Sequence, residues 1–158
     1  MTIRPASVSD GSAVVELWSS LMAEQHEIDP TFCVSADAAE RWLNDFREWV
    51  EAPDVRRIVV AESDGDLVGF ASCQLWWPPP VYKQVLEVYL DELYVIPTYR
   101  RQGIGSQLLT DVADWARDKE AARIRLGTLA ANKDAVEFWK KKGATDFLVA
   151  MILETGIH

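Results

Sequence analysis

The chain has 158 residues, of which 49% are hydrophobic and 26% are charged, a size and balance typical of one globular domain. No apolar run approaches the ~20 residues of a membrane span, and the net charge of −9 argues against a nucleic-acid surface. The N-terminus lacks an apolar leader, and Cys33 and Cys73 stand alone, without a CxxC motif or a nearby histidine. We therefore expect a single domain over residues 1–158 in a reducing cytoplasm, without a membrane partner, disulfide or zinc site.

Apolar spacing predicts alternating helices and strands. Helices are expected where apolar residues recur every three or four positions, and strands where β-branched or aromatic residues cluster or alternate with polar ones. Asp64-Gly65 is typical of a hairpin turn, Pro53 ends a helix and Gly143 stops the last helix. In chain order the predicted elements are a strand at 3–5, a helix capped by Ser9 and Asp10 and reaching Met22, a loop at 26–34, a helix at 35–50, strands at 58–61 and 67–76, a proline-rich loop, a strand at 85–96, a helix at 106–119, a strand at 123–129, a helix at 134–142 and a strand at 147–153.

This order of elements predicts the fold class. Hairpin-connected strands come first, and a strand-helix-strand crossover follows them. We therefore expect an α+β fold, with a mixed, mostly antiparallel twisted sheet of six to seven strands and helices on both faces.

A glycine-rich turn precedes the helix at 106–119. Residues 99–109 form the stretch YRRQGIGSQLL, so two arginines and two glycines stand between a strand and a helix. Glycines let successive main-chain N–H groups converge, and the helix start adds unbonded N–H groups and the positive end of its dipole. This context predicts a diphosphate site, to which Arg100 and Arg101 could add charge. The alternative is a tight turn with solvated arginines.

A Rossmann dinucleotide site fits this turn poorly. That fingerprint needs G-x-G-x-x-G and an acidic residue near the end of the next strand. Here Gly103-Ile104-Gly105 is followed by Leu108 in place of the third glycine, and the next strand ends at 129–131 without an acid. A nucleotide-binding α/β protein is therefore the weakest of the functions considered.

The stretch from Val95 to Ser106 resembles the acyl-CoA signature of the GCN5-related N-acetyltransferase (GNAT) family, whose core is Q/R-x-x-G-x-G/A. Arg100, Gly103 and Gly105 fill its three defined positions, after a valine and a proline that also match. The resemblance implies the acyl-CoA N-acyltransferase fold and acetyl-CoA as co-substrate, with no metal. It also implies that a main-chain N–H near Val95 binds the thioester carbonyl. The cofactor-binding residues expected at this turn are Val95, Arg100, Arg101, Gln102, Gly103, Gly105 and Ser106.

A second segment, from Asn132 to Ala144, extends the resemblance. By itself NKDAVEFWKKKGA predicts an amphipathic helix, with lysines facing water. The family usually has N-x-x-A-x-x-F-Y-x-x-x-G-F here, and Asn132, Ala135, Phe138 and Gly143 match it. The resemblance implies that the Asn132 side chain hydrogen-bonds the pantetheine arm.

Trp139 departs from the family pattern. It occupies the position of a tyrosine that often protonates the departing CoA thiolate in the family. An indole N–H donates a hydrogen bond but does not release its proton at neutral pH. Trp139 is therefore expected to contact the cofactor without acting as the acid, and Tyr94 or Tyr99 could replace that acid.

The strand VLEVYLDELYV, from Val85 to Val95, offers the candidate base. Alternation places Glu87, Tyr89 and Asp91 on a polar face that suits an ammonium-bearing substrate, although it could also be a solvated strand face. An amine must lose a proton before it attacks a thioester, since an alkylammonium has a pKa near ~10. Asp91 is the first candidate for this general base. Glu92 is the second, because a bulge of the kind that the family has in this strand would exchange the two faces.

The acceptor amine is expected to enter between two loops. The loop at 26–34 carries two acidic residues, and Trp76 and Trp77 could stack against a cation, although they could equally cover the sheet edge. Residues 89–92 and 141–146 also resemble diamine and polyamine acetyltransferases.

These features favour an acetyl-CoA-dependent N-acetyltransferase acting on a primary amine of a small molecule, such as a polyamine-like cation. A CoA-binding module without catalysis, motivated by Trp139, and a protein N-acetyltransferase are the alternatives. Many relatives are dimers, so a homodimer is compatible with the sequence.

Overall fold

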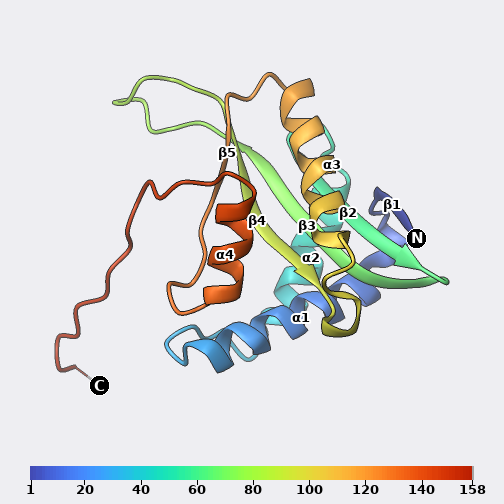
Figure 1. Cartoon of the computed structure of the whole chain (residues 1–158), viewed down its shortest axis with the longest axis horizontal. Coiled ribbons are helices and arrows are strands. Elements are labelled where there is room, and N and C mark those ends of the chain that lie inside the picture. Colours follow the sequence, from blue (N-terminus) through green and yellow to red (C-terminus); the bar gives the residue numbers. More distant parts are fainter. Residues whose placement is uncertain (158) are drawn as a thin grey trace. The chain divides into compact units, whose positions relative to one another are not determined.

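The computed structural model describes residues 1–157. Contacts divide the chain into two compact units, Met1–Gly127 and Thr128–His158, and each unit is described by itself (Figure 1). The expectation of a single domain over residues 1–158 stays a prediction.

The first unit is an α+β sheet structure, as predicted. Its five strands lie in the order β1-β2-β3-β4-β5; β1 to β4 pair antiparallel, and β5 pairs parallel with β4. The elements are β1 (Thr2–Pro5), a 3-10 turn (Val8–Asp10), α1 (Gly11–Ile28), α2 (Ala38–Val50), β2 (Arg56–Ser63), β3 (Asp66–Trp76), β4 (Glu87–Val95), a second 3-10 turn (Pro97–Tyr99), α3 (Ile104–Asp118) and β5 (Ile124–Leu126).

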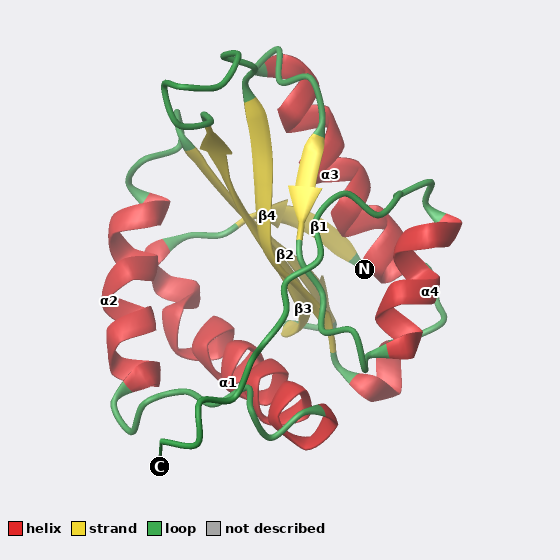
Figure 2. Ribbon diagram, turned by 90° about the vertical axis from the view of Figure 1, so that its left-hand side faces the viewer, coloured by secondary structure: helices red, strands yellow, loops and turns green. Residues whose placement is uncertain are grey.

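Helices cover both faces of this sheet, as Figure 2 shows, with α1 and α2 on one face and α3 on the other. Alternation along the strands supplies an apolar layer to each face. Ile58, Val60 and Phe70 pack with Trp18 and Trp42 under α1 and α2. The intervening strand residues face α3, whose Leu108 and Val112 are fully buried; those strand residues include Val59, Ala61, Ala71 and Cys73. The sheet is therefore held between two cores.

A register shift interrupts the ladder between β3 and β4. Ser72 pairs with Glu92 and Cys73 with Leu90, so Asp91 is the extra residue of a β-bulge. The bulge exchanges the faces of β4 after this point: Glu92 and Tyr94 share the α1–α2 face with Glu87 and Tyr89. Pairing of β4 with β5 covers only Val88 to Leu90, so the second half of β4 has no strand on that edge within residues 1–157.

The first helix is longer than the sequence pattern predicts. The loop was expected to begin at His26, but α1 continues to Ile28 and ends at Asp29. Pro30 explains the end point, because a proline disfavours helical backbone at the residue before it.

No helix of the described chain is both long and apolar enough to cross a membrane.

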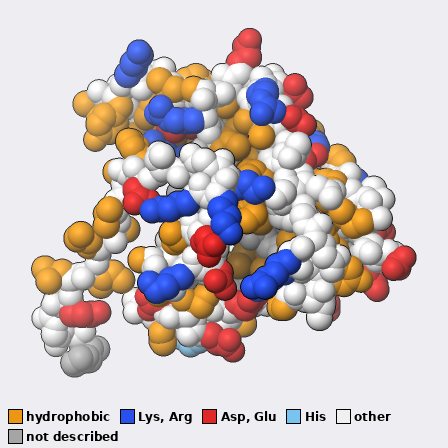
Figure 3. All heavy atoms as spheres, viewed as in Figure 1, with side chains coloured by type: hydrophobic (Ala, Val, Ile, Leu, Met, Phe, Trp, Pro, Cys, Tyr) orange, Lys and Arg blue, Asp and Glu red, His pale blue; other side chains and the backbone are white. Residues whose placement is uncertain are grey.

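The second unit contains α4 (Lys133–Lys141) and an extended C-terminal segment. The strand predicted at 147–153 is absent: these residues form no strand pairing, and most of their large apolar side chains are more than 70% exposed. Figure 3 shows orange hydrophobic side chains along this extended segment. Within residues 1–157 the sheet has five strands, where six to seven were predicted, because an apolar run forms a strand only when a sheet edge is available to pair with it.

Candidate active site

The glycine turn exposes a row of unbonded main-chain donors. The 3-10 turn after β4 leads into it, and Arg101 and Gly103 adopt left-handed φ values of 63° and 82°. Within residues 1–157, none of the N–H groups of residues 101–106 donates a hydrogen bond to the protein. Gly105 and Ser106 lie in the first turn of α3, where the helix leaves such groups unpaired. The unbonded N–H groups expected at this turn are therefore present, and their binding of a diphosphate stays a prediction.

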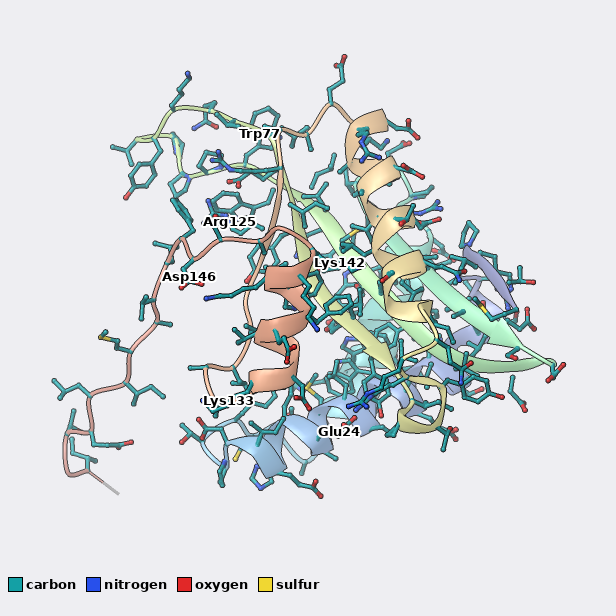
Figure 4. All side chains as sticks on the ribbon, viewed as in Figure 1. Glu24, Trp77, Arg125, Lys133, Lys142 and Asp146 are labelled. Atoms are coloured by element: carbon teal, nitrogen blue, oxygen red, sulfur yellow. The ribbon has the colours of Figure 1, made fainter. Side chains whose placement is uncertain are left out.

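The Arg100 side chain makes several contacts within the protein. Its Nη2 donates to both carboxylate oxygens of Glu24 on α1, at 2.9 and 2.7 Å, and its Nε donates to the carbonyl oxygen of Val95 at 2.7 Å. The guanidinium also lies over the Tyr94 ring, 5.3 Å from its centroid. Figure 4 shows Glu24 on α1 beside the turn that follows β4. The Arg100 guanidinium is therefore engaged within the protein, and its expected contact with a phosphate stays a prediction. Arg101 and Gln102 are exposed.

Val95 presents one N–H group at the open edge of β4. The N–H of Ile96 donates to the Val68 carbonyl across the ladder with β3. Because successive residues of a strand point their N–H groups to opposite edges, the Val95 N–H faces the other edge, which β5 leaves uncovered beyond Leu90. Its carbonyl faces the same way and is held by Arg100.

Glu92 is the most perturbed carboxyl group of the site. It lies opposite Ser72, and its Oε2 is inaccessible to solvent and makes no hydrogen bond. Burial, with the neighbouring Asp91 charge second, raises the pKa of Glu92 to about 7, although polar hydrogens of Trp42, Ser72 and Trp18 oppose the shift. The Trp42 Nε1 is also buried without an acceptor in hydrogen-bonding geometry. Glu92 thus has a pKa near neutrality, as a general base requires.

Asp91 has a different environment at the bulge. The residue is exposed, and both of its carboxylate oxygens accept from the Gln74 amide, at 3.1 and 3.2 Å. Partial desolvation raises the pKa of Asp91, while Gln74 and Arg56 oppose the shift. Asp91 is therefore a hydrogen-bonded carboxylate, whereas Glu92 is the desolvated one.

Glu87 is a buried carboxylate that forms ion pairs with two arginines. It is 2% exposed, and its two oxygens accept from Arg123 at 2.7 Å and from Arg125 at 2.9 Å. Burial alone would raise the pKa of Glu87, but Arg125 and Arg123 outweigh it and lower the pKa. The alternation of β4 predicted Glu87 as a partner for an ammonium substrate; the two arginines already fill that role.

The predicted aromatic residues differ in exposure. The Arg125 guanidinium lies over the Trp76 ring, 4.7 Å from its centroid, so this indole already has a cation against it. Trp77 is 56% exposed in the loop after β3, and Tyr89 is partly buried on β4. Figure 4 labels Trp77 and Arg125.

In the second unit, Asn132 caps α4. Its Oδ1 accepts from the Ala135 N–H at 3.2 Å, the arrangement that asparagine favours at a helix start. Trp139 is partly buried and packs edge-to-face with Phe138, with ring centroids 4.9 Å apart. The roles of Asn132 and Trp139 toward a cofactor stay predictions.

Comparison with known proteins decides the family. Residues 18–144 match the Acetyltransferase (GNAT) family. The chain belongs to this family. A solved structure, the tetramutant of the BH1408 protein from Bacillus halodurans, is similar to this chain with a TM-score of 0.85 at 21% identity. The match covers 98% of this chain and 99% of that chain. The aminoglycoside N-acetyltransferase AAC(6')-Iy, solved in complex with CoA, has a TM-score of 0.77 at 20% identity, with coverage of 99% and 95%. These two likenesses concern the GNAT fold.

A curated GNAT relative is similar over a shorter stretch. The thialysine N-epsilon-acetyltransferase of Sus scrofa is 46% identical over 63 residues, which are 40% of this chain and 37% of that protein. The chain thus spans well under half of the length of this relative.

The two cysteines of this GNAT chain are free. The expectation that no histidine lies near them is wrong for Cys33, whose Sγ is 3.5 Å from His26 Nδ1 and donates to the Pro30 carbonyl. The extension of α1 places His26 within reach. Within the described residues, no group of three or more His, Cys, Asp or Glu side chains is arranged to hold a metal ion.

Sequence reasoning missed several side chains of the candidate site. Ser72 and Gln74 carried a usable signal, since each is a polar residue in a strand that is otherwise apolar. Glu24 and Arg125 gave no such signal, because their partners are distant in the sequence.

Proposed function

We propose that the chain is an acetyl-CoA-dependent N-acetyltransferase that moves an acetyl group to a primary amine of a small molecule. The observation that carries the proposal is the row of unbonded N–H groups at residues 101–106, beside the uncovered edge of β4. The GNAT family match supports the same reaction class. A diphosphate accepts several N–H bonds from such a turn, and an uncovered strand edge can hydrogen-bond an amide-containing arm.

The residues proposed to hold CoA follow from this geometry. The main chain of Arg101, Gln102, Gly103, Gly105 and Ser106 receives the diphosphate, and the Arg101 side chain adds charge. The Val95 N–H donates to the thioester carbonyl oxygen, where negative charge develops during attack. Asn132 and Trp139 are proposed to contact the pantetheine arm and the sulfur, as the family resemblance implies. No metal is required for this reaction.

Glu92 is the proposed general base. Its carboxylate takes a proton from the substrate ammonium, directly or through water, and the neutral nitrogen attacks the carbonyl carbon of the thioester. A C–N bond forms, the C–S bond breaks, and the electron pair leaves with sulfur as the CoA thiolate. The attacking nitrogen loses its second proton to the thiolate or to water, which gives the neutral amide and CoA. Asp91, first expected to be the base, is proposed to act through its negative charge, which helps to raise the pKa of Glu92.

The acceptor is proposed to be a small amine. The relative from Sus scrofa is named for thialysine, an amino acid with a primary amine, and this supports a slim alkylamine. Tyr89 and the exposed Trp77 are the proposed substrate contacts. Trp76 is proposed to line the same site, with the Arg125 guanidinium stacked on its ring. A cytoplasmic location and a homodimer, both expected from the sequence, stay proposals.

A CoA-binding protein without catalysis is the second candidate, because Trp139 cannot donate the proton that a tyrosine would. A thiol with a pKa of ~8.5 is acidic enough for its thiolate to depart unprotonated, so we expect turnover without that acid. A Trp139→Tyr variant should then gain less than about tenfold in kcat, below the usual contribution of a general acid.

Two measurements test the proposal. Isothermal titration with acetyl-CoA should give a Kd below about 1 mM, and an assay of CoA thiol release should respond to at least one primary amine in a panel of diamines, polyamines, thialysine and peptides. Absence of acetyl-CoA binding rejects the proposed function. Binding without release for any amine favours the second candidate, and release with peptides alone favours a protein N-acetyltransferase.

A further inference from the structure

We infer that Glu24 is a positioning residue for the cofactor turn, acting through Arg100. The inference rests on the proposed function only in what the turn binds. Glu24 lies on α1, 76 positions before Arg100, and no motif in the sequence connects the two. The contact joins a helix on one face of the sheet to the turn that follows β4.

The Arg100 side chain makes three contacts at once. Nη2 holds the Glu24 carboxylate, Nε holds the Val95 carbonyl at 2.7 Å, and the plane of the guanidinium lies over Tyr94. These contacts use the planar fork of arginine, with charge-assisted hydrogen bonds at two of its nitrogens. Tyr94 is 5% exposed, so the stacked face of the guanidinium is against the core.

The held carbonyl belongs to the residue whose N–H is proposed to bind the thioester oxygen. Hydrogen bonding to the Val95 carbonyl fixes the following peptide, which starts the segment 96–101. Gly103 and Arg101 have left-handed φ values in this turn, so its shape depends on contacts that hold its ends. Without the Glu24 carboxylate, Nη2 of Arg100 loses its hydrogen-bond acceptors, and the Arg100 side chain becomes more mobile. The N–H groups of residues 101–106 then point in one direction for a smaller fraction of the time.

The same geometry separates this role from direct phosphate binding. If Arg100 touched the diphosphate, Arg100→Lys would keep the positive charge and most of the affinity, and Glu24 would matter little. If Arg100 instead holds the turn in place, Arg100→Lys should weaken CoA binding, because one ammonium group cannot replace the Nε and Nη2 contacts together. Glu24→Gln should then cause a similar loss.

The test compares Glu24→Gln, Arg100→Lys and the double variant, with Glu16→Gln as the matched control on the same helix. Glu16 is exposed, lies outside the loop expected to admit the amine, and forms no ion pair among the described residues. We expect Glu24→Gln and Arg100→Lys each to raise the KM for acetyl-CoA and the Kd for CoA by about three- to tenfold, the range for a partly exposed charge-assisted contact. We expect kcat to change less than about twofold, and the double variant to match the single variants because both remove one interaction.

Hydrogen exchange of the protein without cofactor provides a readout that does not depend on activity. Amides of residues 96–106 should exchange faster in Glu24→Gln than in Glu16→Gln. If exchange and CoA affinity of Glu24→Gln equal those of the control, or if Arg100→Lys keeps wild-type affinity, the inference is overturned. If wild-type protein does not bind CoA, the proposed function fails, and the exchange rates alone decide whether Glu24 positions the turn.

Discussion

Ser72 on β3 and Glu92 on β4 stand opposite each other at the first pair beyond the register shift. This position brings Glu92 to the face that Trp18 and Trp42 cover, where burial raises its pKa to about 7. Asp91, the neighbouring residue in the chain, remains exposed and hydrogen-bonded to Gln74. The bulge therefore gives two adjacent carboxylates different proton affinities, which is how paired acidic residues come to have distinct roles.

The first prediction concerns the pH dependence of activity. If Glu92 is the general base, kcat/KM should rise with pH along a limb with an apparent pKa of about 7, because only the ionised carboxylate accepts a proton. Glu92→Gln should lower kcat/KM by about 10²- to 10³-fold and remove this limb. The measurement is initial CoA release between pH 5.5 and 9 at subsaturating amine.

Asp91→Asn is the matched control for this profile. Removing the negative charge beside Glu92 should lower the Glu92 pKa, so the limb should move to lower pH and kcat/KM should fall far less than in Glu92→Gln. A profile in which Asp91→Asn is the inactive variant and Glu92→Gln keeps the limb would reverse the two assignments.

The second prediction is that the ionised Glu92 side chain lowers the free energy of unfolding. Its folded-state pKa is raised above the ordinary 4.5, so the folded protein binds more protons than the unfolded chain between these values. The free energy of unfolding of the wild type should therefore decrease as pH rises from about 4.5 to 7 and then level off. Relative to wild type, Glu92→Gln should gain about 2 kcal/mol between pH 5 and pH 8, at about 1.4 kcal/mol per pKa unit with allowance for partial solvation. Urea unfolding at both pH values measures the difference; equal shifts at the two pH values would contradict it.

The third prediction has the opposite sign. Glu87 is paired with Arg123 and Arg125, and its pKa is lowered, so its contribution to stability is present above its ordinary pKa and lost as pH falls below it. Glu87→Gln leaves Arg125, whose side chain is 19% exposed, without a carboxylate from Glu87 and should cost about 2–4 kcal/mol at pH 8. At pH 3 the variant and the wild type should differ much less. Urea unfolding of this variant beside Glu92→Gln separates a stabilising carboxylate from a destabilising one.

Much of the fold follows from local sequence signals, but pairing does not. The hairpin at Asp64 and Gly65 and the glycine turn at 103–105 were predicted because each depends on nearby residues. The strand expected at 147–153 is apolar, yet whether such a run pairs depends on an edge elsewhere in the chain. Simple alternation placed Glu87 on the correct face but could not predict its partners Arg123 and Arg125, which are 36 and 38 residues away.

The parts of the candidate site that depend on neighbouring residues could be predicted from the sequence, whereas contacts between distant residues could not. The donors of residues 101–106 belong to one continuous segment, so the sequence predicts their arrangement. The choice between Asp91 and Glu92 depends on one extra residue in a ladder, which shifts every later side chain to the other face. The role of Arg100 depends on Glu24, a surface residue of a helix with many polar positions. Contacts of this kind become visible only when the elements are assembled.

The fourth prediction contrasts two glycines near the proposed cofactor site. Gly103 has a φ of +82°, and a Cβ built on it meets nothing within 4 Å, so Gly103→Ala suffers backbone strain alone. It should lower the free energy of unfolding by about 1–2 kcal/mol, the cost of a left-handed residue, and weaken CoA binding by disturbing the turn. Gly69 has an ordinary φ, but its Cβ would lie 2.8 Å from the Tyr94 carbonyl oxygen, a main-chain atom of β4.

Gly69→Ala should therefore displace β4 next to Val95, because a backbone oxygen cannot turn aside as a flexible side chain can. We expect it to destabilise the protein more than Gly103→Ala and to lower kcat as well as CoA affinity, since both the open edge of β4 and the Val95 N–H would shift. Urea unfolding and steady-state kinetics of the two variants provide the comparison. If Gly69→Ala unfolds like wild type while Gly103→Ala is strongly destabilised, the close approach of β3 and β4 at Gly69 is not what holds this part of the site.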